Sequence, residues 1–268
     1  MIWIKGMSTR DDLFISYPNG EFGINLKCIV DCYLQNDNKL EFQVNFNDSF
    51  YCEDILKLNM ILSRLLDSKE IRYTTDTISN WVNIKPQEIF IKFNYLPFSR
   101  EDREENHRLC TFEYVKELLY LETINWLVDD LHSNKIIISP VNINLFPIKD
   151  YDVIIFPDKG SYEKYGKHID ENNKYFIVCN KKRDKDTGKL LESEMIMTNI
   201  QVEKTSAKLK CLIIDDICSY GNTFKMIPKN ENWTYDLFTI YNECVIDSID
   251  GINKINYIHE INFKRKNK

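Results

Sequence analysis

The sequence has no cysteine pattern typical of a zinc site or a disulfide framework. Its eight cysteines include no CxxC pair, and none stands beside a histidine at the spacing of zinc ligands. Several lie inside apolar, strand-like runs, where cysteine behaves as a small hydrophobic residue. Free thiols are typical of a reducing compartment. We therefore expect a cytoplasmic protein, in the host cytoplasm if the composition rich in isoleucine, asparagine and lysine reflects a viral source.

Membrane and nucleic-acid functions also lack support in the sequence. The apolar runs are all too short to cross a bilayer, and no signal peptide is evident. The formal net charge is −6, and no basic face is evident. The FKRKNK terminus is basic, which is typical of a solvated chain end. The stretch from Gly160 to His168 is not a P-loop, because its glycine spacing is wrong and no serine or threonine follows Lys167. We expect neither a membrane nor a nucleic-acid partner.

Strand-like and helix-like segments alternate along the chain. Continuous apolar runs are typical of strands buried on both faces. The runs are DLFISY, LEFQVNF, EIFIKFNYL, KIIISPV, DVIIFPD, KYFIVCN, KLKCLIIDD and DLFTIYN. Apolar residues at helical spacing predict helices over Glu53–Asp67, Thr111–Leu127 and Glu163–Ile169. This alternation favours an α/β fold with mainly parallel sheets.

A connecting segment interrupts this pattern between residues 140 and 150, where the sequence reads PVNINLFPIKD. Its two prolines and two asparagines are typical of a link between domains. We therefore predict an N-terminal α/β domain of residues 1–139 and a C-terminal α/β domain of residues 140–268.

Charged residues follow four of the predicted strands. Two carboxylates, Asp215 and Asp216, end one strand, and Asp158 follows another. Cations follow the other two, in the segments CNKKR and FSREDR. Each segment alone is typical of a solvated loop, but ligands in open α/β sheets bind beyond the carboxyl ends of the strands. Carboxylates there suit a metal and a sugar diol, and cations suit phosphates, so the set favours phosphoryl or pyrophosphoryl transfer.

The segment LIIDDICSYGNTF resembles the phosphoribosyl-pyrophosphate motif shared by type I phosphoribosyltransferases and ribose-phosphate pyrophosphokinases. Five other segments resemble pyrophosphokinase motifs, in the order of that family and at compatible spacing. They are YPNGE, FSREDR, DDLHSNKIIISPVNINL, FPDKG and CNKKR. The resemblance runs from about Tyr17 to Tyr241 and so covers most of the chain.

The resemblance implies a fold and a reaction. The fold would be two similar α/β domains of the type I phosphoribosyltransferase kind, each with a mainly parallel sheet flanked by helices. The reaction would transfer the β,γ-diphosphate of ATP to the anomeric hydroxyl of ribose 5-phosphate and release AMP. Mg²⁺ would be the cofactor and ATP the co-substrate. A homo-oligomer, dimeric or larger, is also implied, because the YPNGE segment of this family reaches the nucleotide of a neighbouring subunit.

The resemblance also assigns roles to individual residues. Those that bind ATP would be Tyr17, Asn19, Glu21, Arg100, Glu101 and Arg103. The metal and the transferred group would be organised by His132 and Asp158. Catalysis would depend on Lys181, Arg183 and His132. The ribose hydroxyls would be held by Asp215 and Asp216. The loop around the acceptor's 5-phosphate would be Ser219, Tyr220, Gly221, Asn222 and Thr223. Apart from the motif order, His132 is equally typical of a surface loop.

The acceptor loop departs from the family pattern D-T-A/G-G-T. Ser219 replaces the aspartate, Tyr220 replaces a threonine and Asn222 replaces a glycine. Small residues there allow the backbone to approach a phosphate closely. We therefore favour ADP-ribose as the acceptor, as in a phage branch of the family that makes ADP-ribose 1-pyrophosphate to rebuild NAD⁺. Ribose 5-phosphate is the alternative. Glu101 also replaces the usual glutamine, which puts the adenine contact in question.

Two other classes share part of this pattern. A phosphoribosyltransferase has the carboxylate-pair motif but needs neither YPNGE, FSREDR nor CNKKR. An inactive regulatory homologue would not need to keep Lys181, Arg183, His132 and Asp158. Formation of AMP from ATP separates a pyrophosphokinase from both.

Overall fold

The structure is a computed structural model of the 268-residue chain. It describes residues 2–7, 13–18, 22–46, 51–67, 71–74, 79–98, 110–128, 146–169, 174–183, 190–200, 207–243 and 246–260. The chain divides into two compact units, Met1–Ser139 and Pro140–Lys268, which we call unit 1 and unit 2. Each is described by itself.

Unit 1 contains a four-stranded sheet in the order β1-β4-β7-β8. The strands are β1 (Ile2–Ile4), β4 (Leu40–Val44), β7 (Ile89–Phe93) and β8 (Asn125–Val128). All are parallel except β1, which runs antiparallel to β4. In β4 and β7 every second side chain is buried, which is the period expected when a sheet packs one face against its helices.

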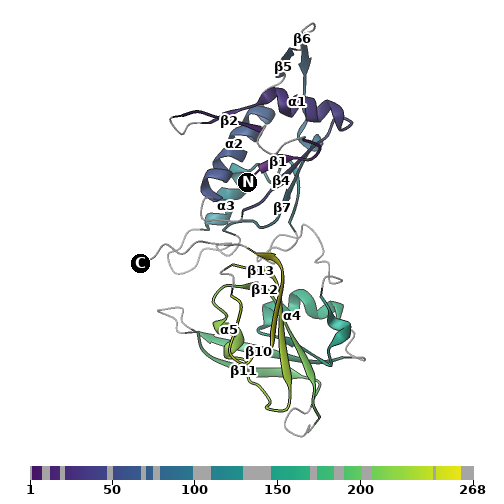
Figure 1. Cartoon of the computed structure of the whole chain (residues 1–268), viewed down its shortest axis with the longest axis vertical. Coiled ribbons are helices and arrows are strands. Elements are labelled where there is room, and N and C mark those ends of the chain that lie inside the picture. The colour runs from purple at the N-terminus through teal and green to yellow at the C-terminus, as the bar shows by residue number, and fades with distance from the viewer. Residues whose placement is uncertain are drawn as a thin grey trace. The chain divides into compact units, whose positions relative to one another are not determined.

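Three helices and two hairpins complete unit 1. The helices are α1 (Leu26–Gln35), α2 (Tyr51–Asp67) and α3 (Thr111–Leu118). In Figure 1, α2 and α3 lie on one side of the sheet. Short antiparallel pairs join β2 (Phe14–Ser16) to β3 (Phe22–Ile24), and β5 (Ile71–Thr74) to β6 (Ser79–Val82). The helix predicted over Glu53–Asp67 is confirmed as α2.

The helix predicted over Thr111–Leu127 is wrong in its second half. Helix α3 ends at Leu118, and Tyr120 has a φ of 53°, in the left-handed region. That conformation ends a helix. The remaining apolar residues belong to β8, which pairs with β7. A short apolar run at a helix end does not by itself distinguish another helical turn from a buried strand.

Unit 2 contains a six-stranded sheet in the order β11-β10-β9-β12-β13-β14. The strands are β9 (Val153–Phe156), β10 (Tyr175–Arg183), β11 (Leu190–Thr198), β12 (Lys210–Cys218), β13 (Thr234–Asn242) and β14 (Lys254–Glu260). Only the edge strand β11 is antiparallel to its neighbour among these paired strands. The central strands are buried along almost their whole length, as expected for a parallel sheet covered on both faces.

Different elements cover the two faces of this sheet. Phe224 of the short helix α5 (Asn222–Lys225) packs in a buried cluster with Ile155 and Ile213. On the other face, Tyr162 of α4 (Lys159–Tyr165) contacts the ring of Phe156. Figure 1 shows α4 and α5 on opposite sides of the sheet. Short 3-10 turns at Ile148–Asp150 and Gly166–His168 flank β9 and α4. The helix predicted over Glu163–Ile169 is therefore correct in kind but shifted: its first residues belong to α4, and the 3-10 turn at Gly166–His168 follows.

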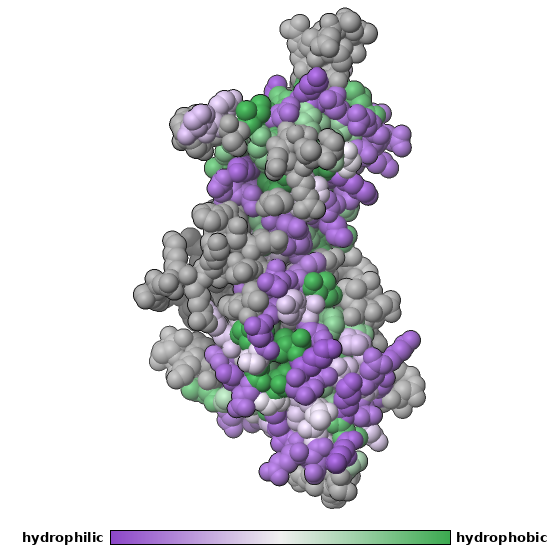
Figure 2. Space-filling view, viewed as in Figure 1, coloured by the Kyte–Doolittle hydropathy of each residue, from purple (hydrophilic) through white to green (hydrophobic). Residues whose placement is uncertain are grey.

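The predicted α/β class with mainly parallel sheets flanked by helices is confirmed. Seven of the eight predicted strand runs contain observed strands, and the run KLKCLIIDD among them forms part of β12. The run KIIISPV lies outside the described residues. No described helix is long and apolar enough to cross a membrane. Figure 2 shows hydrophilic residues over most of the described surface on this face, with hydrophobic residues gathered in a small patch on unit 2.

Candidate active site

The register of the sheet in unit 2 brings three strand ends together. Ile155 of β9 pairs with Ile177 of β10 on one side and with Ile213 of β12 on the other. All three strands run in the same direction, so the residues that follow these positions lie at the same edge of the sheet. Asp158, Lys181 and Asp215 are those residues, and they meet there as a cluster.

Lys181 lies at the centre of this cluster. Its Nζ is 2.6 Å from Oδ2 of Asp158 and 3.9 Å from Oδ2 of Asp215, and its side chain is 14% exposed. Burial lowers the pKa of Lys181, but the charges of Asp215 and Asp158 raise it by more. The net pKa is therefore above its ordinary value, and the ammonium stays protonated at neutral pH. Lys181 is therefore a largely buried cation at neutral pH.

Asp158 also caps the N-terminus of α4. It is the N-cap of that helix, and its Oδ1 accepts a hydrogen bond of 2.8 Å from the backbone N–H of Ser161. The Ser161 hydroxyl donates to the carbonyl of Ile214 at 2.7 Å. Because Oδ1 of Asp158 caps the helix, its Oδ2 remains for the ion pair with Lys181. The Ser161 hydroxyl connects the first turn of α4 to β12. The segment FPDKG therefore fixes a carboxylate at the strand edge.

The predicted strand end at Asp215 and Asp216 is wrong by two residues, because β12 continues to Cys218 through its pairing with β13. The two adjacent carboxyl groups have different partners. Oδ1 of Asp215 accepts a hydrogen bond of 3.0 Å from the backbone N–H of Asp216. Asp216 is buried and lies 3.7 Å from the Nζ of Lys164 in α4. Successive side chains in a strand point to opposite faces, so a diol that reaches both carboxylates has to lie across the end of the strand.

A buried hydroxyl lies beside Asp215. Thr239 of β13 pairs in register with Asp215 and is fully buried. Within the described part of the chain, its Oγ1 has no hydrogen-bond partner. Buried hydroxyl groups are costly to leave unpaired, so this position suits a polar ligand atom or a water at the carboxyl edge.

The ionisation of Asp215 gives a testable pH dependence. Burial, followed by the charges of Asp216 and Asp158, raises its pKa from an ordinary value of 3.8 to about 8, against the opposing effect of Lys181. A raised carboxyl pKa contributes stability that is fully present below the ordinary value and is lost as the pH rises through the folded value. Relative to Asp215→Asn, the wild-type protein should therefore lose stability between about pH 4 and pH 8.

Thermal melts of both proteins from pH 5 to pH 9 measure this loss. We expect the melting temperature of the wild type to fall, relative to the variant, by on the order of 5 °C. Asp247→Asn removes the same charge from an exposed position, and its melting curve should stay parallel to that of the wild type. Parallel curves for Asp215→Asn as well would contradict the expectation.

The acceptor loop follows β12 directly. Gly221 has a φ of 72° and precedes α5 as its N-cap. Tyr220 is 58% exposed and Asn222 is exposed, whereas Thr223 is half-buried. The hydroxyl of Ser219 forms a short hydrogen bond with Oε2 of Glu243. The loop thus contains an exposed aromatic side chain and a half-buried serine that is paired with a buried glutamate.

Glycine is required at position 221 for two reasons. Its φ is unfavourable for other residues, and an added Cβ would lie 2.7 Å from Cγ1 of Ile249 in the core. We expect Gly221→Ala to lower the free energy of unfolding by about 2 kcal/mol or more. Gly251→Ala is the matched control, because its φ is 70° but the Cβ would meet the side chain of Lys229. Equal losses in urea titrations would contradict a role for Ile249.

The structure places the other predicted site residues as follows. Tyr17 lies in unit 1 after β2 and is 48% exposed. The backbone of Arg183 ends β10 and pairs with Leu190 of β11. Six predicted residues lie outside the described part of the chain: Asn19, Glu21, Arg100, Glu101, Arg103 and His132. The predicted residues that the structure brings together are therefore Asp158, Lys181, Asp215 and Asp216.

Mg²⁺ fits the donor chemistry of this cluster. The ion prefers oxygen ligands and commonly binds through one or two carboxylates together with substrate phosphates. Asp158, one of the two residues assigned to the metal, supplies carboxylate oxygens beside Lys181. Among the described residues, no three side chains of histidine, cysteine, aspartate or glutamate form a ready-made metal site. Substrate phosphates would complete the coordination.

Three residues at this edge were missed in the sequence. They are Ser161 and Lys164 of α4 and Glu243 after β13. The rule that identified Asp158 and Asp215, a polar residue directly after a buried strand, also applies to Glu243. Lys164 follows Ser161 by three residues on one short helix, and nothing in the sequence indicates that this helix faces Asp216.

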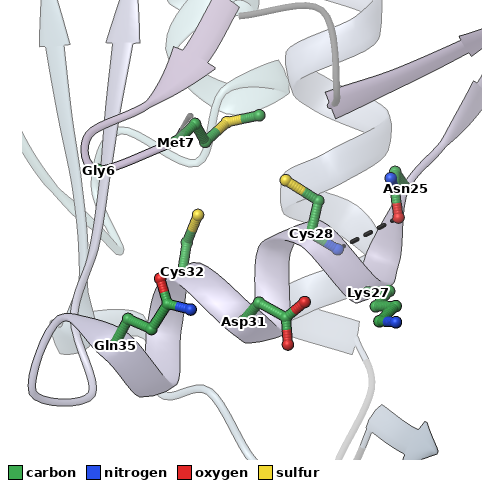
Figure 3. Close-up of a pocket in the computed structure, with 8 residues that line it drawn as sticks. All are labelled: Gly6, Met7, Asn25, Lys27, Cys28, Asp31, Cys32 and Gln35. Atoms are coloured by element: carbon green, nitrogen blue, oxygen red, sulfur yellow. Dashed lines mark hydrogen bonds between the residues drawn. The ribbon is translucent and has the colours of Figure 1, made fainter. Parts of the chain in front are cut away.

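Unit 1 contains a separate cavity of about 410 Å³ at the start of α1. Figure 3 shows its lining, with the sulfur atoms of Met7, Cys28 and Cys32 around it and the backbone N–H of Cys28 donating to Asn25. The hydrogen bond caps α1. No site residue predicted from the sequence lines this cavity.

Comparisons with known proteins give information on the fold. No family model matches the chain, and no curated protein matches it. Among solved structures, a phosphoribosylpyrophosphate synthetase from Mycobacterium smegmatis is similar, with a TM-score of 0.52 and 14% sequence identity, over 91% of this chain and 72% of that one. At this identity the likeness shows a shared fold.

A second solved structure is a hypothetical protein from Neisseria gonorrhoeae with bound ppGpp. It has a TM-score of 0.28 and 12% identity, over 42% of this chain and 70% of that one. The score is too low to support any conclusion about this protein.

Proposed function

We propose that this protein is an ATP-dependent pyrophosphokinase. It transfers the β,γ-diphosphate of ATP to the anomeric hydroxyl of a ribose-5-phosphate moiety and releases AMP. The main support is the buried ammonium of Lys181, held between Asp158 and Asp215 at the carboxyl edge of a parallel sheet. Ligands of open α/β sheets bind at that edge. The fold shared with a phosphoribosylpyrophosphate synthetase is consistent with it.

The residues of the cluster suit the steps of this reaction. The ammonium of Lys181 can neutralise negative charge that develops on the transferred diphosphate. Asp215, once ionised, can accept hydrogen bonds from a ribose hydroxyl. Asp158 can hold Mg²⁺, together with His132 as the resemblance implies. When bound, Mg²⁺ would supply positive charge that neutralises part of the charge on the phosphates of ATP. Transfer then depends mainly on positioning and charge neutralisation.

The identity of the acceptor substrate depends on the acceptor loop, Ser219 to Thr223. We favour ADP-ribose, which gives ADP-ribose 1-pyrophosphate for rebuilding NAD⁺, because the exposed ring of Tyr220 can stack on the adenosine. Ribose 5-phosphate, which gives phosphoribosyl pyrophosphate, is the alternative. The remaining site assignments, including Arg183, Arg100, Glu101 and Arg103, are part of the same proposal, as is a cytoplasmic location.

A dimer or larger assembly is also expected. Tyr17 is half-exposed in unit 1, and in the proposed role it stacks on the adenine bound by a neighbouring subunit. Closed symmetric assembly supplies such a contact. Light scattering of the active enzyme should give at least twice the chain mass of 31.9 kDa. A fully active monomer would contradict the assignment of Tyr17.

The proposal is tested by separating the nucleotides after incubation with ATP, Mg²⁺ and either acceptor. AMP should form only when an acceptor is present and should disappear when the metal is chelated. Formation of ADP in its place would indicate transfer of a single phosphoryl group and would overturn the mechanism. A phosphoribosyltransferase would leave ATP unchanged.

A further inference from the structure

The acceptor loop lies against a buried carboxylate. Strands β12 and β13 run side by side in parallel (Figure 1), with Cys218 paired to Asn242. The next residues along the two strands are Ser219 and Glu243. The backbone N–H of Glu243 donates to the carbonyl of Cys218 at 2.9 Å, so the two chains stay paired past the strand ends. Glu243 is 6% exposed.

This contact occupies the Ser219 hydroxyl. Its Oγ forms a short hydrogen bond with Oε2 of Glu243. A serine hydroxyl has one proton to donate, and a carboxylate only accepts hydrogen bonds. The proton therefore points to Glu243, and the hydroxyl has none left to donate to a ligand phosphate. In a loop that wraps a phosphate monoester, the hydroxyl groups have to serve as donors.

Glu243 also places negative charge at the base of the loop. A phosphate monoester carries about 1.5 to 2 negative charges at pH 7, whereas a phosphate joined to a second group carries about one. Lys229, which follows α5, donates to the carbonyls of Phe224, Lys225 and Ile227. Those bonds hold it at the helix end.

We propose that Glu243 is a specificity-determining residue that makes this loop reject a terminal phosphate monoester and accept a singly charged, substituted 5-phosphoryl group. The inference rests on the proposed function, because it concerns the acceptor of that reaction. This effect is distinct from stacking on Tyr220, because it predicts that the protein discriminates between 5-phosphoryl groups by their charge even when no adenosine is present. ADP-ribose belongs to the accepted class, as does any ribose 5-phosphate esterified at phosphorus.

Two small probes isolate the effect of charge. Ribose 5-phosphate and its methyl ester share the sugar and the phosphorus, differ by about one charge, and lack adenosine. Calorimetric titration of the wild-type protein in the absence of ATP should show the methyl ester binding at least about tenfold more tightly. Equal affinities, or tighter binding of ribose 5-phosphate, would overturn the proposal, and this measurement needs no variant.

Glu243→Gln tests the residue itself. The variant removes the charge, and its amide N–H can donate to the Ser219 hydroxyl, which frees the serine proton for a ligand. Ribose 5-phosphate should therefore bind about tenfold more tightly, and the two probes should differ by less than about threefold. Glu231→Gln is the control, because it removes one charge from an exposed position before β13, at the opposite end of that strand. It should keep the wild-type ratio. An unchanged ratio in Glu243→Gln would overturn the role of Glu243.

The affinity ratio of the two probes tests the role of Glu243, and AMP formation tests the proposed reaction, so either proposal can be contradicted without the other. If the charge preference is present but no acceptor yields AMP from ATP, the proposed reaction is wrong and the loop still selects by charge. If AMP forms with ribose 5-phosphate as readily as with its methyl ester, the reaction stands and the role of Glu243 is wrong.

Discussion

Replacing Lys181 with alanine is expected to lower turnover by about a hundredfold or more, equivalent to roughly 3 kcal/mol of transition-state stabilisation. The ammonium is largely buried and protonated, and it lies 2.6 Å from Oδ2 of Asp158 and 3.9 Å from Oδ2 of Asp215 at the sheet edge. It is therefore already oriented when charge develops on the transferred group. Steady-state rates with saturating ATP and acceptor measure the effect. Arg183→Ala is expected to lose a similar factor, from the role that the resemblance implies.

The neighbouring lysine provides a matched control. Lys182 is half-exposed and pairs with Glu192 and Glu194 of β11, at 3.2 Å and 3.1 Å. Adjacent strand residues point to opposite faces, so Lys182→Ala removes the same charge without touching the cluster and should keep nearly full turnover. Thermal melts confirm that both variants fold. Near-normal turnover of a folded Lys181→Ala protein would remove this residue from the mechanism.

The second large effect is expected in the choice of acceptor. The wild-type protein should use ADP-ribose with a higher kcat/KM than ribose 5-phosphate, because specificity resides in that ratio. Stacking of the adenosine on Tyr220 is worth about 1–3 kcal/mol, or roughly 5- to 100-fold. In the double variant Tyr220→Thr, Asn222→Gly the preference should shift toward ribose 5-phosphate by a comparable factor.

An exposed tyrosine elsewhere controls for the loss of an aromatic ring. Tyr175 begins β10 at the opposite edge of the sheet and is about as exposed as Tyr220. Tyr175→Thr should leave the ratio of kcat/KM values unchanged. A wild-type ratio that favours ribose 5-phosphate would return the acceptor to the ordinary one of the resembling family and leave the loop sequence without a role.

Part of this site could be predicted because parallel sheets impose a simple rule. Strands that run in one direction end at one edge, so charged residues that follow buried runs meet there. Asp158 follows β9, and Lys181 and Asp215 lie near the ends of the neighbouring strands β10 and β12. The sequence indicates each of these strands by its continuous apolar run. The fold class followed from the same runs.

The rest depends on contacts that no local pattern encodes. The ion pair of Lys164 with Asp216 requires α4 to pack against the end of β12. Edge strand β11 was missed because several of its side chains are exposed, Met195 and Ile196 among them, so it gives no continuous buried run. In the segment 111–127, the left-handed conformation of Tyr120 separates a helix from a strand, and tyrosine carries no sequence signal for that conformation.

Analysis of the acceptor product by mass spectrometry and phosphorus NMR tests the proposed reaction most directly. After a reaction with ATP and Mg²⁺, the acceptor should carry a diphosphate on its anomeric carbon, with one AMP released for each molecule formed. An acceptor that gains a single phosphoryl group alongside ADP, or AMP that forms with no change in the acceptor, would contradict pyrophosphoryl transfer at this site.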